Sequence, residues 1–171
     1  MIFVTVGQHI RGFPRLVKGI DDIAGQIQEE VVMQIGSTDY IPRNGRWFRF
    51  TDYEEMKQLN SQARVVITHA GAGSIITALK AGAAIILVPR LSQYGEALDD
   101  HQLQLANAMS ANGRAKVVHD VRELGNALQN VIKPEQTNSS RKRLVKALRE
   151  HLENLARGRR HVADTTSPNN H

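Results

Sequence analysis

Residues 64–77 read Arg64-Val-Val-Ile-Thr-His-Ala-Gly-Ala-Gly-Ser-Ile-Ile-Thr77, and this stretch carries the main evidence for the fold class. Its first five residues are mostly β-branched and apolar, which predicts a buried strand. Gly71 and Gly73 follow, and the residues up to about Ala81 have the spacing of a helix. A strand that turns through glycines into a helix is typical of α/β proteins.

The same alternation of strands and helices extends along the chain in both directions. The pattern predicts further strands at 2–6, 31–35, 46–50, 83–88 and 116–118, and helices at 14–28, 54–62, 100–112 and 121–132. In the first of these helices we expect Ile27 at the end of the buried face. Strands that are apolar on both faces indicate a parallel sheet covered by helices on both sides. The sequence therefore predicts an α/β, Rossmann-like, three-layer domain with a mostly parallel sheet.

The charge is distributed unevenly. The formal net charge is +5, but residues 141–160 hold eight Lys or Arg and only two Glu, so the rest of the chain is close to neutral. We predict a domain at 1–133, a linker with a basic amphipathic helix at 134–161, and a polar tail at 162–171. The basic face of that helix is most simply solvated; the alternative is docking on a membrane subunit or anionic headgroups.

Composition excludes several classes of function. With 171 residues the chain has room for one sizeable core, and without Cys it has no disulfide, thiol nucleophile or Cys-based zinc site. The longest apolar stretch, Ala83–Val88, is far below the roughly 18 residues of a membrane-spanning helix. The N-terminus lacks the features of a signal peptide. We expect a cytoplasmic protein, and we expect no metal because neither an Asp-x-Asp motif nor a His/carboxylate cluster is apparent.

The stretch after Thr68 has the features of an anion site. Gly71 and Gly73 let backbone N–H groups approach a ligand, and the helix N-terminus that follows favours negative charge by about 0.3–1 kcal/mol. Ser74 adds a hydroxyl, and His69 adds a donor and, when protonated, a positive charge. The pattern predicts a diphosphate site. The alternative is that the glycines only permit tight strand–helix packing and that His69 is a core histidine.

Two better-known phosphate motifs do not fit. A dinucleotide fingerprint requires Gly or Ala at position 76, which is Ile76, and it follows the first strand rather than a late one. A Walker A loop requires Gly-Lys-Ser/Thr, which is absent. Redox and phosphoryl-transfer functions are therefore disfavoured.

Four segments together resemble a known family. They are His69-Ala-Gly-Ala-Gly-Ser74, Ala78-Leu-Lys-Ala-Gly-Ala83, Ile86-Leu-Val-Pro-Arg90 and Asp100-His-Gln102. Over roughly residues 1–130 the chain is similar to the C-terminal, donor-binding domain of family 28 glycosyltransferases, in particular to small stand-alone chains of the Alg13/PssE/EpsF type. The resemblance implies one half of a GT-B fold.

The resemblance also implies a set of site residues. His69 and His101 are the catalytic candidates. The sequence departs from the family pattern at two positions: Thr77 stands where relatives often have a Glu that holds ribose, and Gln8 stands where many have Thr. The implied substrate-binding residues are Gly7 and Gln8 on one side of the diphosphate, His69, Gly71, Gly73 and Ser74 on the other, Phe50-Thr51-Asp52 beside uracil, and Asp100, His101 and Gln102 facing the sugar hydroxyls.

The implied activity is inverting transfer of a hexose-type sugar from a UDP-sugar to a polyprenyl-(pyro)phosphate-linked acceptor in polysaccharide biosynthesis. The donor substrate is the only small molecule implied, without a further cofactor. The acceptor site is expected on a membrane-anchored Alg14/PssD-like subunit, which places this chain peripherally on the cytoplasmic membrane face. The alternative is a non-catalytic nucleotide-binding or scaffolding module. Nucleic-acid binding through 141–160 ranks last because aromatic residues are only 5% of the chain.

Four other polar side chains have less certain roles on the sequence alone. Arg90, after a strand and Pro89, is either exposed or in contact with a partner or substrate. Glu96 in the 91–99 loop is expected to be a solvated acid, the alternative being a carboxylate at the cleft. His9 is expected to be an ordinary loop residue. His101 belongs either to the site or only to the start of a helix capped by an Asp.

Overall fold

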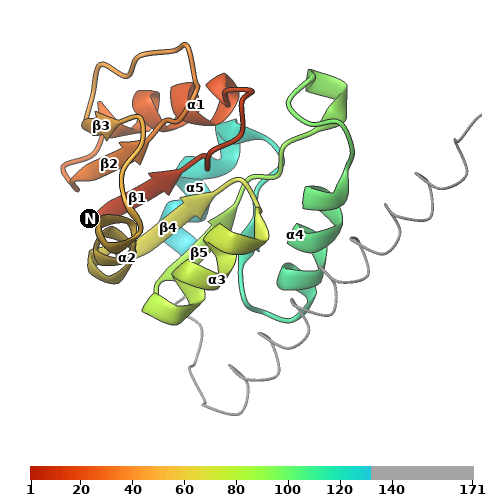
Figure 1. Ribbon diagram of the computed structural model, residues 1–171. Coiled ribbons are helices and arrows are strands. Elements are labelled where there is room, and N and C mark those ends of the chain that lie inside the picture. The colour runs from red at the N-terminus through yellow and green to blue at the C-terminus, as the bar shows by residue number, and fades with distance from the viewer. Residues whose placement is uncertain (132–171) are drawn as a thin grey trace, which may run out of the picture. The chain divides into compact units, whose positions relative to one another are not determined.

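The computed structural model describes residues 1–131, which contain one six-stranded sheet in the order β3-β2-β1-β4-β5-β6 (Figure 1). Every strand pair is parallel. The predicted α/β, Rossmann-like class is confirmed. The strands are β1 (Ile2–Thr5), β2 (Val31–Gln34), β3 (Arg46–Phe48), β4 (Val65–Thr68), β5 (Ala84–Leu87) and β6 (Lys116–Val117).

Helices cover both faces of this sheet (Figure 1). The α-helices are α1 (Pro14–Ala24), α2 (Tyr53–Gln62), α3 (Ala72–Ala81), α4 (His101–Ala111) and α5 (Leu124–Asn130), and the short 3₁₀ helices are η1 (Ser92–Tyr94) and η2 (Val121–Glu123). On one face, α1 and α5 pack together on a cluster of buried aliphatic side chains, and on the other α2 packs against α3. Both faces are apolar because β1, β2, β4 and β5 are buried along their whole length.

The first helix is shorter than its apolar spacing predicts. It ends at Ala24, where the N–H of Gly25 donates to the carbonyl of Asp21 and the N–H of Gln26 donates to the carbonyl of Ile23. The prediction for Ile27 was therefore wrong: it lies beyond the helix with 36% of its surface exposed. Glycine has a low helix propensity, and the single apolar residue of the predicted helix beyond Gly25, Ile27, does not extend the helix past it.

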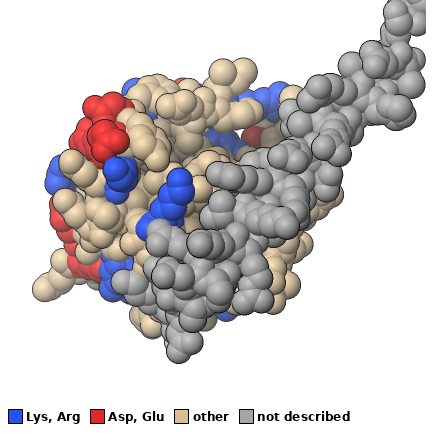
Figure 2. All heavy atoms as spheres, turned by 60° about the horizontal axis from the view of Figure 1, so that its bottom comes forward, with Lys and Arg blue, Asp and Glu red and all other residues tan. Residues whose placement is uncertain are grey.

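The basic segment predicted at 134–161 and the tail at 162–171 lie outside the described residues. Residues 1–131 contain thirteen Lys or Arg and thirteen Asp or Glu, so this part of the chain is formally neutral. Figure 2 shows the two signs interspersed among uncharged side chains on the visible part of the described surface. Among residues 1–131 no helix is both long enough and apolar enough to cross a membrane.

The strand order reverses between β1 and β4, and the fold places a cleft there. The chain leaves β1 toward β2 on one side and enters β4 on the other, so the loops after these two strands diverge. Such a switch point is where open parallel sheets bind ligands. Three polar residues end the central strands in register, because Thr5 lies opposite both Gln34 and Thr68. They form the polar floor below the two loops.

Candidate functional site

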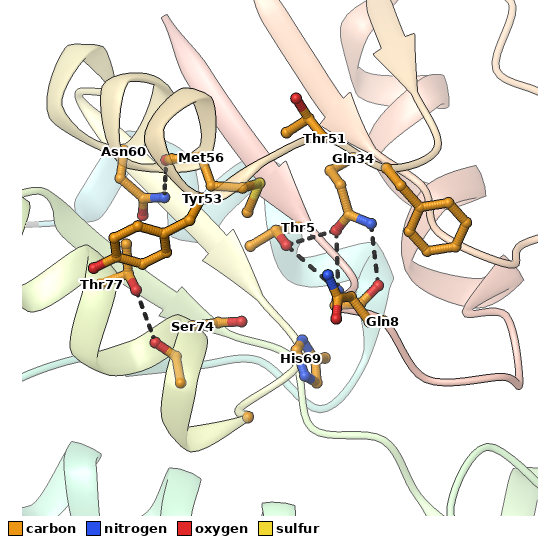
Figure 3. Close-up of a pocket in the computed structure, with 14 residues that line it drawn as sticks. Thr5, Gln8, Gln34, Thr51, Tyr53, Met56, Asn60, His69, Ser74 and Thr77 are labelled. Carbon is orange, nitrogen blue, oxygen red and sulfur yellow. Dashed lines mark hydrogen bonds between the residues drawn. The ribbon is translucent and has the colours of Figure 1, made fainter.

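A cavity of about 390 Å³ opens at this switch point, between the loops after β1 and β4 and the first turns of α2 and α3 (Figure 3). We call it the β1/β4 cavity. His69, Gln8 and Gln34 lie at one end of it, and Tyr53 and Asn60 lie at the other. Among residues 1–131, those that line it include no Lys, Arg, Asp or Glu. An anion in this cavity would therefore be held by backbone and neutral polar groups.

A second cavity of about 570 Å³ is larger but less suited to a phosphate. It lies at the amino ends of the strands, where Ile2, Glu29 and Arg64 are among its lining residues. Glu29 and Arg64 are already paired with each other there at 2.7 Å. Because ligands of open parallel sheets bind at the carboxyl ends of strands, we assign the site to the β1/β4 cavity despite its smaller volume.

The turn from β4 into α3 presents backbone donors to the cavity. Gly71 is the N-cap of α3 and supplies no side-chain acceptor, so the N–H groups of Ala72, Gly73 and Ser74 have no cap within the described chain. Just before it, Ala70 is fully buried with a φ of +61°, a left-handed conformation that costs a non-glycine residue about 1–2 kcal/mol. This strained turn aims the start of the helix at the cavity, which is the arrangement an anion site requires.

His69 fills the space between the two loops. A Cβ atom built on Gly7 would lie 2.6 Å from Cε1 of His69, and one built on Gly71 would lie 2.3 Å from its Nε2. Both distances are shorter than any real contact, so neither glycine can carry a side chain while the ring stays in place. The Nδ1 atom of His69 lies 3.2 Å from Oγ1 of Thr68. The imidazole thus joins the loops after β1 and β4 into one surface.

The His69 ring is neutral at pH 7. Burial, followed by the positive charge of Arg90, lowers its pKa to about 4, although a hydrogen bond with the Thr5 backbone acts in the opposite direction. In the free protein His69 therefore adds no positive charge to the site, and of the two contributions considered from the sequence only the hydrogen-bond donor remains. The ring can still donate one hydrogen bond, and an anion bound beside it would raise its pKa.

Gln34 fixes the loop after β1. Its Oε1 accepts hydrogen bonds from Oγ1 of Thr5 at 2.7 Å and from the N–H of Gly7 at 3.1 Å. Its Nε2 donates to the carbonyl of Gly7 at 3.0 Å (Figure 3). The same atom donates to the carbonyl of Arg49 at 2.8 Å. Both backbone groups of Gly7 are thereby occupied. Gly7 contributes space and shape to the cavity, whereas Gln8, which is exposed, keeps its polar groups available.

One wall of the cavity comes from α2. Tyr53, Met56 and Asn60 line it, at positions i, i+3 and i+7 of that helix, together with Phe50 and Thr51 before the helix. The side chain of Asn60 is buried; its Nδ2 donates to the carbonyl of Met56 at 2.7 Å, and its Oδ1 has no partner. Sequence reasoning named Phe50 and Thr51 and predicted a helix at 54–62, but it did not place that helix at the site, although the i, i+3, i+7 spacing shows that its three residues share a face.

The predicted site residues fall into two groups. Eight of them line the β1/β4 cavity: Gly7, Gln8, Phe50, Thr51, His69, Gly71, Gly73 and Ser74. Asp52 does not line it and instead caps α2, where it accepts from the N–H of Glu55. Asp100, His101 and Gln102 do not line it either, and lie at the start of α4. There Asp100 accepts from the N–H of Ser92, Nε2 of His101 lies 3.6 Å from Asp99, and Gln102 accepts from the N–H of Arg90. Thr77 lines the cavity, but its hydroxyl donates to the carbonyl of Gly73 at 3.0 Å.

Arg90 and Glu96 are both buried, contrary to expectation. Arg90 is 1% exposed, so it is not a surface residue, and it does not line the β1/β4 cavity. Glu96 is 7% exposed and forms a two-pronged ion pair with Arg15, at 2.8 and 2.9 Å. The partners lie about eighty residues away in sequence, so no local pattern predicts them. Within residues 1–131, no group of three or more His, Asp or Glu is placed to hold a metal ion.

Comparison with known proteins identifies a family. Residues 1–155 match the family model described as the glycosyltransferase family 28 C-terminal domain. The chain shares its fold with the solution structure of ALG13, with 20% identity and a TM-score of 0.56 over 84% of this chain and 93% of that one. No curated protein matches the chain.

Longer proteins contain the same fold as one part. A UDP-glucose:anthocyanidin 3-O-glucosyltransferase in complex with UDP matches with 15% identity and a TM-score of 0.59, over 89% of this chain and 35% of that one. The UDP-GlcNAc 2-epimerase of Methanocaldococcus jannaschii matches with 15% identity and a TM-score of 0.54, over 87% and 45%. The chain therefore spans less than half the length of these proteins.

The first prediction concerns pH. An unfolded His69 binds a proton below pH 6.5, whereas the folded one does so only near pH 4. The contribution of His69 to folding stability should therefore fall by about 3 kcal/mol as the pH drops from 6.5 to 4. Urea denaturation at pH 7 and pH 4 should show that His69→Gln loses less stability than the unaltered protein. Equal losses in both proteins would contradict the assignment.

The second prediction separates the two glycines of the β4–α3 turn. Gly71→Ala should destabilise the protein by about 2 kcal/mol because its methyl group overlaps the His69 ring. Gly73→Ala should be neutral or stabilise the protein by up to about 1 kcal/mol, because nothing lies within 4 Å of its Cβ position and Ala favours helix. Thermal denaturation measures both; similar losses in the two variants would refute the described packing.

Proposed function

Because the chain belongs to the glycosyltransferase family 28 C-terminal domain family, we propose that it binds the UDP-sugar donor of a glycosyltransferase. The observation that carries this proposal is the set of uncapped N–H groups at the start of α3, which open onto the β1/β4 cavity. A helix N-terminus of this kind binds phosphate through its N–H groups and its dipole. The proposed ligand places its pyrophosphate there.

The opposite end of the cavity suits the nucleoside. Tyr53 and Met56 supply apolar surface on which a base can pack, and Asn60 has an unpartnered oxygen at this wall. Thr77 differs from the Glu of many relatives, and its hydroxyl is already bonded to Gly73. In this proposal the nucleoside is therefore held mainly by shape, apolar contact and backbone groups. The sugar extends beyond the pyrophosphate toward the start of α4, where Asp100, His101 and Gln102 lie.

The proposed chemistry is an inverting displacement at the anomeric carbon of the sugar. An acceptor oxygen forms the new bond to that carbon while the bond to the β-phosphate oxygen of UDP breaks, and the electron pair leaves with UDP. The N–H groups of α3 would stabilise the growing negative charge on the leaving group. His69, neutral in the free protein, would act as a hydrogen-bond donor to the same group rather than as a general base.

The acceptor site belongs to a second component in this proposal. The family model that matches the chain is a C-terminal domain, and within residues 1–131 the cavity lining offers no carboxylate that could deprotonate an acceptor. We therefore place the general base and the polyprenyl-linked acceptor on a membrane-anchored partner subunit. The partner would also bring this chain to the cytoplasmic face of the membrane.

The lack of a carboxylate in the described cavity lining also fits a second function, a nucleotide-binding module without catalysis. Co-expression with the partner subunit distinguishes the two. Transfer of sugar from a radiolabelled UDP-sugar to a lipid-linked acceptor, dependent on both chains, supports the enzyme. A stable complex that binds UDP-sugar but never releases UDP supports the module.

The third prediction tests the site itself. Gly73→Val should weaken UDP binding by more than about tenfold, or ~1.4 kcal/mol, because its side chain occupies the space through which a phosphate approaches the N–H groups. Gly125→Val is the matched control: Gly125 is also an uncrowded helical glycine, but it lies in the other cavity. Isothermal titration calorimetry with UDP should show loss only in Gly73→Val. Equal affinities in both variants would refute the site.

A further inference from the structure

The described lining of the β1/β4 cavity lacks a positively charged side chain, which a pyrophosphate site would be expected to have. A nucleoside diphosphate carries more than one negative charge at pH 7, yet no Lys or Arg among the described residues lines the cavity, and burial keeps His69 neutral there. Helix dipole and backbone donors act on the anion, but a full positive charge nearby would act more strongly. One element that supplies such a charge is the end of β5.

Arg90 lies three residues beyond Leu87, the last paired position of that strand, and brings its guanidinium under the loop after β1. Its Nη1 donates to the carbonyl of Gly12 at 2.7 Å, and its Nη2 donates to the carbonyl of Val6 at 3.1 Å. The guanidinium carbon lies 4.6 Å from the centre of the Phe13 ring. The side chain is 1% exposed, and its Nε has no hydrogen-bond partner.

Within residues 1–131, no ion pair neutralises the charge of Arg90. The nearby acid, Glu96, uses both carboxylate oxygens on Arg15 and also accepts from the N–H of Leu91 at 3.1 Å. Burial lowers the pKa of Arg90 to about 10, so it remains protonated at pH 7. A buried cation that pairs only with carbonyl groups is costly for folding, which suggests a role beyond stability.

A single peptide bond connects Arg90 with the cavity. The carbonyl of the Val6–Gly7 peptide accepts from Arg90, and the N–H of the same peptide donates to Oε1 of Gln34 at 3.1 Å. Gly7 then lines the cavity and contacts the His69 ring. Arg90 therefore lies directly behind the cavity wall, close enough for its charge to act on His69.

We propose that Arg90 is a positioning residue that supplies the fixed positive charge of the pyrophosphate subsite from behind the Val6–Gly7 peptide. The inference rests on the proposed function, since it assigns a role within the same site. Without touching the ligand, Arg90 holds the loop in shape and attracts the anion through the wall. The alternative is that Arg90 only holds the loop.

Arg90→Gln removes the charge but keeps a side chain that can donate to one carbonyl. Calorimetry with UDP and with uridine should show UDP affinity lower by roughly tenfold and uridine affinity unchanged, because only UDP carries the diphosphate. Arg46→Gln is the matched control, since Arg46 is an exposed residue paired with Glu30 and its loss changes the net charge equally. It should bind both ligands normally.

Glu96→Gln provides a second test in a nearly isosteric variant. Removing the negative charge of Glu96 leaves less of the positive charge of Arg90 compensated. UDP should therefore bind severalfold more tightly, and the affinity for uridine should not change. In Arg90→Gln, NMR titration of the free protein should also show a higher His69 pKa. If Arg90→Gln lowers the affinities for UDP and uridine equally, or changes neither, the inference about Arg90 is overturned while the proposed function stands. If the unaltered protein binds no UDP, both the inference and the proposed function fail.

Discussion

The imidazole of His69 is the contact on which the site depends. It occupies the gap between the loops after β1 and β4, and it can do so only because Gly7 and Gly71 have no side chains to overlap it. The left-handed Ala70 is the strained link that brings His69 and the start of α3 to the same side of the sheet. The fold thus accepts local strain, and the result is a helix N-terminus that opens onto a cavity instead of packing against the chain.

The electrostatics of the site follow from the same packing. Burial that fits His69 between two glycines also makes it neutral, so this residue shapes the cavity and donates a hydrogen bond without adding charge. The charge is held one layer further back, on Arg90, where carbonyl groups and Phe13 surround it. Separating the donor groups from the charge keeps the cavity surface uncharged in the free protein while favouring an anion inside it.

Sequence reasoning worked best where the signal is local. The strand before His69, the glycine turn and the helix after it were predictable because β-branched residues and glycines act within a few positions. The neutral state of His69 was not predictable, because it results from burial under segments that are distant in the sequence. Arg90 bonds to Gly12 and Glu96 pairs with Arg15, at separations of 78 and 81 residues, so their burial could not be inferred from neighbours in the chain. The helical spacing of Tyr53, Met56 and Asn60 in α2 can be recognised in the sequence, but only the folded chain shows which face of this helix meets α3.

The most direct test of this account is an amide-resolved NMR titration of the labelled protein with UDP. We expect the largest shifts at the N–H groups of Ala72, Gly73 and Ser74, and we expect these shifts to be absent with uridine. Such a result would place the pyrophosphate at the start of α3. Shifts concentrated around Ile2 and Gln129 in the other cavity, or the same shifts with uridine as with UDP, would contradict the account.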